Sequence, residues 1–398
     1  MDLGSLVPEG SPFPIQNLPL GVAQLPDGSV STVVRIGDHG VVVRRLEEAD
    51  LWSGPAGNLH GLGRQGARDL RGRVSELLKT GRSLSEFLVE VSALRMLVPY
   101  RIHAFVDFYS GIHHASNVGK MFRPEMPPLL PNYRHLPVAY NGRASTVFPT
   151  GTTIVRPKGQ IKPPNAENPI FGPTKELDFE LELGFFVSDS SVYGAPLSVE
   201  EAEERMMGLV LVNDWSAREV QRWEYQPLGP FLAKSFATSV SPWVVSLDAL
   251  EPFRVAGVTQ EPPVLPHLSA TRPHHFDLTL EVAIRTAAMS QPQIVTRSNA
   301  RHMYWSFAQQ LAHLTSNDCN CEEGDLYASG TISGPEPESF GSLLELTWRG
   351  TKPLTMEETG ETRTFLEDGD TVIMTAFAER DGLKIGFGEV RGTVLPAT

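Results

Sequence analysis

The sequence predicts a mostly β fold with few helices, divided into a small N-terminal β domain and a larger C-terminal β domain. The chain contains 35 glycines and 32 prolines, most of them between short runs of valine, isoleucine, phenylalanine and leucine, which is typical of strands joined by many turns. Residues 177–187 add a direct strand signal, because acidic and apolar side chains alternate there. With 398 residues, 41% of them hydrophobic, the chain is long enough to bury a core in each of two domains.

The first hundred residues contain short strand-like runs, such as STVVRIGDHGVVV, beside an interval rich in glycine and arginine. Ser83 and Glu86 have the spacing of a capping box, so we expect a helix over residues 85–97 that is ended by the following proline. Beyond this point the segments become longer and more aromatic. We therefore divide the chain into predicted domains of residues 1–100 and 101–398.

Two other helices are expected in the larger domain. Ser198 and Glu201 again have the spacing of a capping box, and they predict a short acidic helix. Asn299 is a candidate N-cap for a helix over residues 300–314.

Composition limits the classes of partner and the location of the protein. The formal net charge of -13 argues against nucleic acid or an anionic membrane as partner, because both attract basic surfaces. Neither a charged-then-apolar leader nor an apolar run of about 18 residues occurs, so we expect a soluble chain without an export signal. Cys319 and Cys321 are too close to pair easily, and no second thiol pair completes a zinc site. Reduced, structural cysteines and a cytoplasmic location follow as expectations.

Three acids recur at every second position of the segment LDFELELGFFV, namely Asp178, Glu180 and Glu182. On one strand these side chains share a face, which could be a solvated face of an amphipathic surface strand. The alternation stops at residues 184–187, however, where both faces are apolar, as in strands covered on both sides. Carboxylates in that environment require protonation or a neutralising cation.

Asp107 in AFVDFYSG and Asp214 in GLVLVNDWSARE also lie within or at the end of apolar runs. Either could be an ordinary turn residue at a strand end. Together with Glu180 and Glu182 they form a possible all-oxygen ligand set from three segments, without histidine or cysteine. Such a set suits Mg²⁺ or Ca²⁺ better than zinc.

Four segments resemble the fumarylacetoacetase family, whose members hydrolyse fumarylacetoacetate to fumarate and acetoacetate at the end of tyrosine and phenylalanine breakdown. The resemblance covers nearly the whole chain, and SPFPIQNLPLGV resembles the N-terminal domain that smaller hydrolases and decarboxylases of the superfamily usually lack. The four segments are VDFYSGIHHASNVGKMFRP, LDFELELGFFV, NDWSAREVQRWEYQPLGPFLAKSFATSVSPWVV and ASGTISGPEPESFGSLLELTW.

The resemblance implies a small SH3-like N-terminal β domain, a larger domain of wrapped mixed sheets that holds the active site, and a homodimer. It implies Ca²⁺ or Mg²⁺ bound by Asp107, Glu180, Glu182 and Asp214. Asp178 would be a solvated or outer acid behind them. Some family members hold a further Mg²⁺ near the positions that match Asp214, Lys234 and Thr238.

The resemblance also implies catalytic roles. His114 matches the general base, and Glu345, which we place in a strand of SLLELTW, matches the carboxylate that orients it. His113 is the rival base, but adjacent side chains on an extended segment point apart, so only one can face the site. Residues that polarise the carbonyl or stabilise the oxyanion match Lys234, Arg218 and Gln221, with Lys234 also placed to protonate the leaving carbon. Substrate contacts match Tyr109, Arg123, Tyr140, Gln221, Tyr225 and Thr331.

Arg123 suits a carboxylate of a small diketo dicarboxylate substrate, because its guanidinium pairs with both oxygens. Two other functions remain open at this point. One is a related hydrolase or decarboxylase acting on an acylpyruvate or oxaloacetate, against which Arg123, Tyr225 and the N-terminal domain argue. The other is a catalytically silent Ca²⁺-binding β protein, against which His114 and Lys234 argue.

Overall fold

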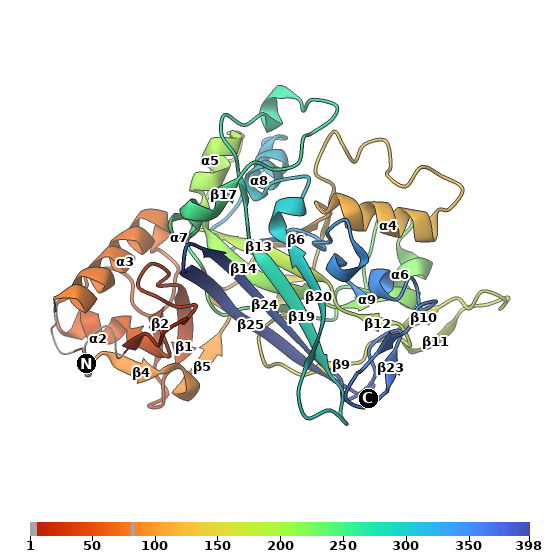
Figure 1. The fold of residues 1–398 in the computed structure, drawn as a ribbon. Helices are drawn as coiled ribbons and strands as arrows, with labels where there is room; N and C mark the ends of the chain where they lie inside the picture. The colour runs from red at the N-terminus through yellow and green to blue at the C-terminus, as the bar shows by residue number, and fades with distance from the viewer. Residues whose placement is uncertain (1–5, 81–83) are drawn as a thin grey trace.

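The computed structural model describes residues 6–80 and 84–398, and its main sheets have five, seven and five strands (Figure 1). The first sheet is antiparallel throughout and has the order β4-β3-β2-β1-β5. All of it comes from residues 20–97; that this region is a separate SH3-like domain stays a prediction. Its strands are β1 (Leu20–Gln24), β2 (Val30–Ile36), β3 (His39–Val42), β4 (Leu88–Glu90) and β5 (Arg95–Leu97).

Two helices accompany this sheet, α2 (Val43–Glu48) and α3 (Gly63–Lys79). Sequence reasoning missed α3, which occupies the glycine- and arginine-rich interval. Its buried residues recur at helical spacing, but Gly66 and Gly72 in the helix interior weaken the helical signal. The buried apolar residues are Ala67, Leu70, Val74, Leu77 and Leu78.

The helix expected over residues 85–97 is wrong, and Ser83 of its supposed capping box lies outside the described residues. The segment instead forms β4, the 3₁₀ turn η1 (Val91–Ala93) and β5. β4 pairs with β3 and β5 pairs with β1, so both edges of the sheet come from this segment. Pairing with distant strands has overridden the local helical pattern.

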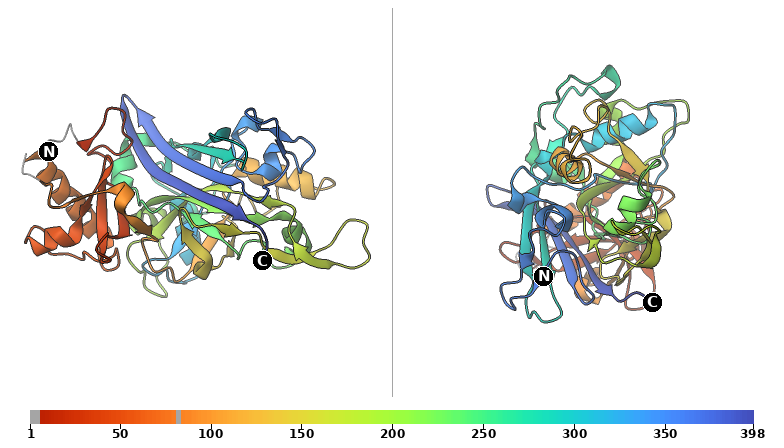
Figure 2. Two further views of the ribbon diagram at one scale, coloured as in Figure 1. Left: turned by 90° about the horizontal axis from the view of Figure 1, so that it is seen from below. Right: turned by 90° about the vertical axis from the view of Figure 1, so that its right-hand side faces the viewer.

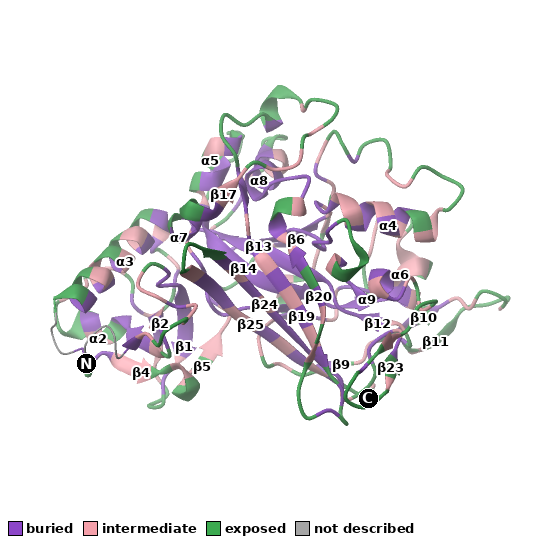
Figure 3. Ribbon diagram, viewed as in Figure 1, coloured by how far each residue is buried: buried purple, intermediate pink, exposed green. Residues whose placement is uncertain are grey.

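The seven-stranded sheet is mixed and has the order β7-β6-β21-β13-β14-β16-β8. The β21–β6 and β16–β8 pairs are parallel, and the other pairs are antiparallel. Every residue of β13 and β14 is buried, as expected for strands covered on both faces (Figure 3). Its strands are β6 (Phe105–Phe108), β7 (Ala139–Asn141), β8 (Val147–Pro149), β13 (Leu181–Val187), β14 (Met206–Asp214), β16 (Thr238–Val240) and β21 (Leu326–Ala328).

The second five-stranded sheet has the order β20-β19-β24-β25-β9 and packs its long strands across β14, with which it shares the largest core (Figure 2). Its strands are β9 (Ile154–Val155), β19 (Thr279–Arg285), β20 (Gln293–Asn299), β24 (Thr371–Arg380) and β25 (Leu383–Leu395). Two-stranded ribbons are formed by β10 (Lys158–Ile161) with β11 (Ile170–Pro173), β12 (Leu177–Asp178) with β15 (Ser216–Ala217), β17 (Arg254–Val255) with β18 (His275–Phe276), and β22 (Leu354–Thr355) with β23 (Thr362–Arg363).

Short helices connect these strands. The acidic helix α5 begins with the expected capping box of Ser198 and Glu201. Asn299, by contrast, caps only the 3₁₀ turn η5, and the helix α8 starts later, with Ser306 and Gln309 as its capping box. The helices are α4 (Ile112–Phe122), α5 (Val199–Glu204), α6 (Arg218–Glu224), α7 (Leu247–Leu250), α8 (Phe307–Thr315) and α9 (Leu343–Leu346); the 3₁₀ turns are η2 (Ala144–Thr146), η3 (Glu251–Phe253), η4 (Pro266–Leu268), η5 (Ala300–His302) and η6 (Pro337–Ser339).

Among the described residues, none of the helices is both long and apolar enough to cross a membrane. The two cysteines are unpaired, and Cys321 is buried whereas Cys319 is exposed.

One face of the seven-stranded sheet carries apolar core residues at one end and acidic residues at the other. Alternation puts Glu182 on the same face of β13 as Phe186, and Asp214 on the same face of β14 as Val210. Phe186 and Val210 belong to a core cluster that also contains residues of β1, β2 and α3, including Leu70. The N-terminal sheet therefore covers one end of this face, and the acids occupy the other end.

We predict that the N-terminal sheet and the seven-stranded sheet unfold together. Phe186→Ala opens a cavity in their shared core, so it should lower the free energy of unfolding by about 3–5 kcal/mol while leaving one calorimetric transition. Phe171→Ala on exposed β11 is the control and should change stability by less than about 0.5 kcal/mol. Two separate transitions, with only the first shifted, would contradict the shared core.

Candidate active site

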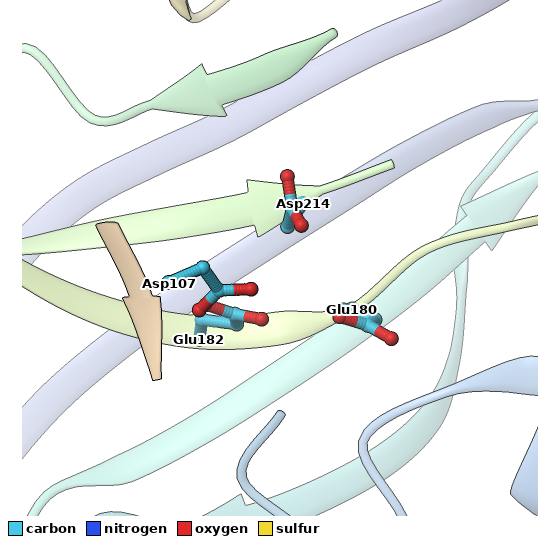
Figure 4. A group of neighbouring side chains, drawn as sticks. All are labelled: Asp107, Glu180, Glu182 and Asp214. Carbon is cyan, nitrogen blue, oxygen red and sulfur yellow. The ribbon is translucent and has the colours of Figure 1, made fainter. Parts of the chain in front are cut away.

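Four carboxylates converge at the end of the seven-stranded sheet, and each offers an oxygen within 4.8 Å of the others (Figure 4). Asp107 lies on β6, Glu182 on β13, Asp214 at the end of β14 and Glu180 immediately before β13. All four are buried. The strand order β6-β21-β13-β14 brings these segments together, although they are distant in the sequence.

Two buried cations compensate part of this negative charge. Lys234 donates to a carboxylate oxygen of Glu180 and, at 2.9 Å, to Asp214 Oδ2. Arg218 Nη1 donates to Glu180 Oε1 at 2.7 Å. Burial opposes ionisation, but Asp214 and Glu180 raise the pKa of Lys234 above its usual range. Burial likewise opposes ionisation of Glu180, but Lys234 and Arg218 hold its pKa well below the usual range.

Asp107 and Glu182 form no ion pair among the described residues, and Lys234 acts on them only at a distance. Burial, with the neighbouring carboxylates, raises the pKa of both groups well above their usual range. Asp107 Oδ1 accepts a hydrogen bond from Gly330 N at 3.0 Å, whereas neither carboxylate oxygen of Glu182 has a hydrogen-bond donor among the described residues. A carboxylate that is buried without donors requires a proton or a metal ion.

A charge count favours a divalent cation at this place. With Asp178, which pairs with Arg218, five buried carboxylates face two buried bases, so full ionisation leaves a formal charge of -5 + 2 = -3. A divalent cation would reduce this to -1. The donor set is entirely oxygen, which fits Ca²⁺ or Mg²⁺. These residues therefore fit the metal expected from the sequence.

Thr238 and Tyr140 complete the surroundings of Asp214. Thr238 Oγ1 donates to Asp214 Oδ1 and the Tyr140 hydroxyl donates to Asp214 Oδ2, both at 2.6 Å. Thr238 and Lys234 thus contact the same carboxylate from opposite oxygens. A separate Mg²⁺ near these residues stays a prediction.

His114 and Glu345 form a buried pair, with His114 Nδ1 and Glu345 Oε2 2.6 Å apart. Both of the expected local structures are wrong: His114 lies on helix α4, not on an extended segment, and Glu345 lies on helix α9, not in a strand. His113, one position away on α4, does not line the cavity and instead packs edge-to-face on His302, with ring centroids 6.0 Å apart. Neighbouring helical residues also point in different directions, so His114 lines the cavity and His113 does not; the role of His114 as base stays a prediction.

Sequence reasoning missed the residues that hold Glu345. Asn117 Nδ2 donates to Glu345 Oε1 at 3.0 Å, while Ser333 and Ser342 donate to Glu345 Oε2 at 2.8 and 2.9 Å. Burial opposes ionisation of Glu345, but His114 and these hydrogen bonds lower its pKa. The spacing of Ser342 and Glu345 is that of a capping box, and it was the available signal for a helix here.

A cavity of about 330 Å³ adjoins the His114–Glu345 pair, which we call the dyad, and the cluster of four carboxylates. Its wall contains every substrate contact expected from the sequence, together with Asp107, His114, Glu180, Arg218 and Lys234; Glu182, Asp214, Thr238 and Glu345 lie outside the wall. The residues expected to contact substrate are Tyr109, Arg123, Tyr140, Gln221, Tyr225 and Thr331.

Several polar groups in this wall have unused hydrogen-bonding capacity. Arg123 Nη2 donates to Pro128 O at 3.2 Å, but its Nε has no acceptor and no ion pair of its guanidinium occurs among the described residues. Thr331 Oγ1 is also buried without a partner. Gln221 Oε1 accepts from Arg218 Nη1 at 3.1 Å, which leaves its NH₂ group for the cavity.

The structure decides between the two alternatives expected for Asp178 and favours the outer acid. Asp178 is fully buried, not solvated, and it lies on the separate short strand β12, two residues before Glu180. Arg218 Nε donates to its Oδ2 at 2.8 Å. The three acids of LDFELELGFFV therefore do not share the face of one continuous strand.

Comparison with known proteins agrees with this site. Residues 103–395 match the family described as fumarylacetoacetate (FAA) hydrolase, C-terminal. The chain belongs to the fumarylacetoacetate hydrolase family. It is 46% identical to the fumarylacetoacetase of Rattus norvegicus and 45% identical to that of Homo sapiens, in each case over 98% of both chains.

These relatives identify the chain as an enzyme, a hydrolase of the fumarylacetoacetase type. The fold is also that of solved members of the fumarylacetoacetate hydrolase family. Fumarylacetoacetate hydrolase from psychrophilic Exiguobacterium antarcticum superposes with a TM-score of 0.54 at 17% identity, covering 95% of this chain and 99% of that one. At this identity the likeness concerns the fold alone.

We predict that Ca²⁺ or Mg²⁺ raises the thermal stability of the protein and that chelation lowers it. A cation at 100 times its Kd stabilises the folded state by about 2.7 kcal/mol. Glu182→Gln removes one repelling charge, so it should raise the melting temperature of the metal-free protein and abolish the response to metal, as measured by calorimetry and titration of metal binding.

The matched control is Glu203→Gln. Glu203 is another buried glutamate, but it pairs with Arg254, Arg272 and His274, away from the cavity. This variant should be less stable than the wild type and should keep the full response to metal. Metal binding by Glu182→Gln with wild-type affinity would refute the ligand assignment.

Proposed function

We propose that the protein hydrolyses the carbon–carbon bond of 4-fumarylacetoacetate to fumarate and acetoacetate, in a metal-dependent reaction at the end of tyrosine and phenylalanine breakdown. The observation that carries this proposal is the cavity itself. It joins a histidine–carboxylate dyad, a carboxylate cluster suited to a divalent cation, and an unpaired arginine. The 46% identity with a fumarylacetoacetase supports the choice of substrate.

Asp107, Glu180, Glu182 and Asp214 would hold Ca²⁺ or Mg²⁺. When bound, such an ion supplies Lewis-acid polarisation of the diketone oxygens and a template for their orientation.

His114 is the general base in this reaction. Glu345 is an ionised acceptor, so the proton of the imidazole lies on Nδ1, where it is donated to Glu345. The opposite ring nitrogen, Nε2, is then bare and can take a proton from water that attacks the carbonyl carbon. Glu345 also stabilises the imidazolium that results.

The oxyanion and the leaving carbon require donors. Arg218 is held by Glu180 and Gln221 at the edge of the cavity, and the NH₂ group of Gln221 is available for the oxyanion. A fixed donor of this kind lowers the barrier by typically about 3 kcal/mol. Lys234 stays protonated because carboxylates surround it, and it can deliver a proton to the leaving carbon.

Recognition of the substrate carboxylate depends on Arg123. Its half-buried guanidinium lies in the cavity wall without a carboxylate partner, and an arginine in that state favours an anionic ligand. Tyr109, Tyr225 and Thr331 line the same wall, and their hydroxyls would bind the oxygens along the substrate.

A spectrophotometric assay tests this function directly. The protein should consume fumarylacetoacetate, and excess chelator should abolish turnover until Ca²⁺ or Mg²⁺ is restored. Acylpyruvates and oxaloacetate serve as comparison substrates, and a higher kcat/KM on either would replace the proposed substrate. Homodimer formation and a cytoplasmic location belong to the same proposal; sedimentation and cell fractionation test them.

We predict that Glu345→Gln lowers kcat by about 10²- to 10³-fold. The amide can donate to the imidazole and favour the wrong tautomer; in serine proteases the equivalent change costs about 10⁴-fold, and the metal should moderate the loss here. His114→Ala should lose at least about 10²-fold. His113→Ala is the matched control and should retain near-normal activity. Near-normal kcat in folded, metal-loaded Glu345→Gln would disprove the dyad.

We predict that Arg123→Met raises KM more than it lowers kcat, because the carboxylate is bound equally in the ground and transition states. Steady-state kinetics with fumarylacetoacetate and with its mono-esters provide the measurement. Esterification at the recognised carboxylate should harm the wild type more than the variant. Equal losses in both proteins would mean that another residue binds this group.

A further inference from the structure

Asp178 lies behind the cavity and does not line it, yet it is fully buried and surrounded by donors. Its Oδ1 accepts from the amides of Phe179 at 2.8 Å and Leu343 at 2.7 Å. Its Oδ2 accepts from Arg218 Nε at 2.8 Å and from the amide of Leu344 at 3.0 Å. Arg218 Nη2 makes a further contact with Oδ2 at 2.8 Å.

These contacts connect two parts of the proposed catalytic machinery. Leu343 and Leu344 form the first positions of helix α9, and Glu345 follows directly on that helix. Arg218 extends from Asp178 to Glu180 and Gln221 at the cavity wall. Asp178 is thus hydrogen-bonded both to the backbone of the helix that carries Glu345 and to the guanidinium of Arg218, a residue of the cavity wall.

We infer that Asp178 is a positioning residue, which sets the place of Glu345 through the first turn of α9 and the place of Arg218 through its guanidinium. The inference rests on the proposed function only where it is measured by kcat. A helix of four residues has little stability of its own, so its orientation must come from such tertiary contacts.

Asparagine cannot replace this carboxylate. Every contact of Asp178 is with a donor, so in either orientation the NH₂ group of asparagine would face an N–H group. Arg218 would also lose one of its two carboxylate partners, so that Glu180 alone would balance the positive charge of the guanidinium. Both α9 and Arg218 should move away from the positions that the reaction needs.

The first experiment compares Asp178→Asn with Asp370→Asn in the full-length, metal-loaded protein. Asp370 is a matched control, because it is also fully buried and accepts from Arg363 Nε and Nη2, at 2.8 and 3.0 Å, and from the amide of Glu367, but outside the cavity wall. Asp178→Asn should lower kcat by about 10- to 100-fold. KM should stay within about twofold, because substrate binding by Arg123 is untouched. Asp370→Asn should keep the wild-type kcat.

A second pair of variants tests the helix contact without changing Asp178. Leu343 is the first residue of α9, where proline is tolerated, and Ser342 has the extended backbone that must precede proline. Leu343→Pro removes the amide donor that α9 supplies to Asp178 Oδ1 and leaves that of Phe179, while Leu343→Ala truncates the same side chain and keeps both donors. We expect kcat to be about 10-fold lower for Leu343→Pro than for Leu343→Ala.

A substrate-free measurement separates this inference from the proposed function. The Nδ1 proton of His114, shared with Glu345, should give a low-field proton resonance, which His114→Ala identifies by removing it. The resonance should be lost or shifted in Asp178→Asn and Leu343→Pro, and retained in Asp370→Asn and Leu343→Ala. This result would support the positioning role even if fumarylacetoacetate proved to be the wrong substrate.

The inference would be overturned by an unchanged resonance in Asp178→Asn and Leu343→Pro. It would equally be overturned if Asp178→Asn lost no more kcat than Asp370→Asn. If Asp178→Asn does not fold, the Leu343 pair decides by the same two measurements.

Discussion

The site depends on the placement of more negative charge in the protein interior than the surrounding cations neutralise. Asp107, Glu180, Glu182 and Asp214 lie together because neighbouring strands end at one place, and strands that are buried on both faces cannot turn these side chains toward water. Lys234 and Arg218 balance part of the charge, and the remaining carboxylates require protons or a cation.

Strands and helices position different groups around these carboxylates. The strands of the seven-stranded sheet place the carboxylates, and their core with the N-terminal sheet and with β24 and β25 prevents them from moving apart. Helices place the groups to which the proposed mechanism gives proton transfer and oxyanion binding: His114 on α4, Glu345 on α9 and Arg218 on α6. Because α9 is too short to be stable alone, side-chain and backbone hydrogen bonds have to fix it.

Much of the candidate site could be predicted from the sequence. Alternation and the apolar runs around Asp107, Glu180 and Asp214 pointed to buried acids, and the family resemblance assigned roles to residues that the fold indeed gathers around one cavity. Prediction was incomplete where several long-range contacts act on one side chain. A solvated Asp178 stayed open as an alternative because its partners, Arg218 and the start of α9, lie about 40 and 165 residues further along the chain.

By itself the sequence determined the features that depend on neighbouring residues: the strand-rich character, the buried strand β13, the capping box of α5 and the acidic residue types that suit a hard cation. Only the tertiary structure decided which edge segments become strands β4 and β5, that Glu345 stands on a helix, and which acid pairs with which base. The physical reason is the range of the interactions. Periodicity and capping act within a few residues, whereas strand pairing, burial and ion pairing act between segments whose proximity exists only after the chain has folded.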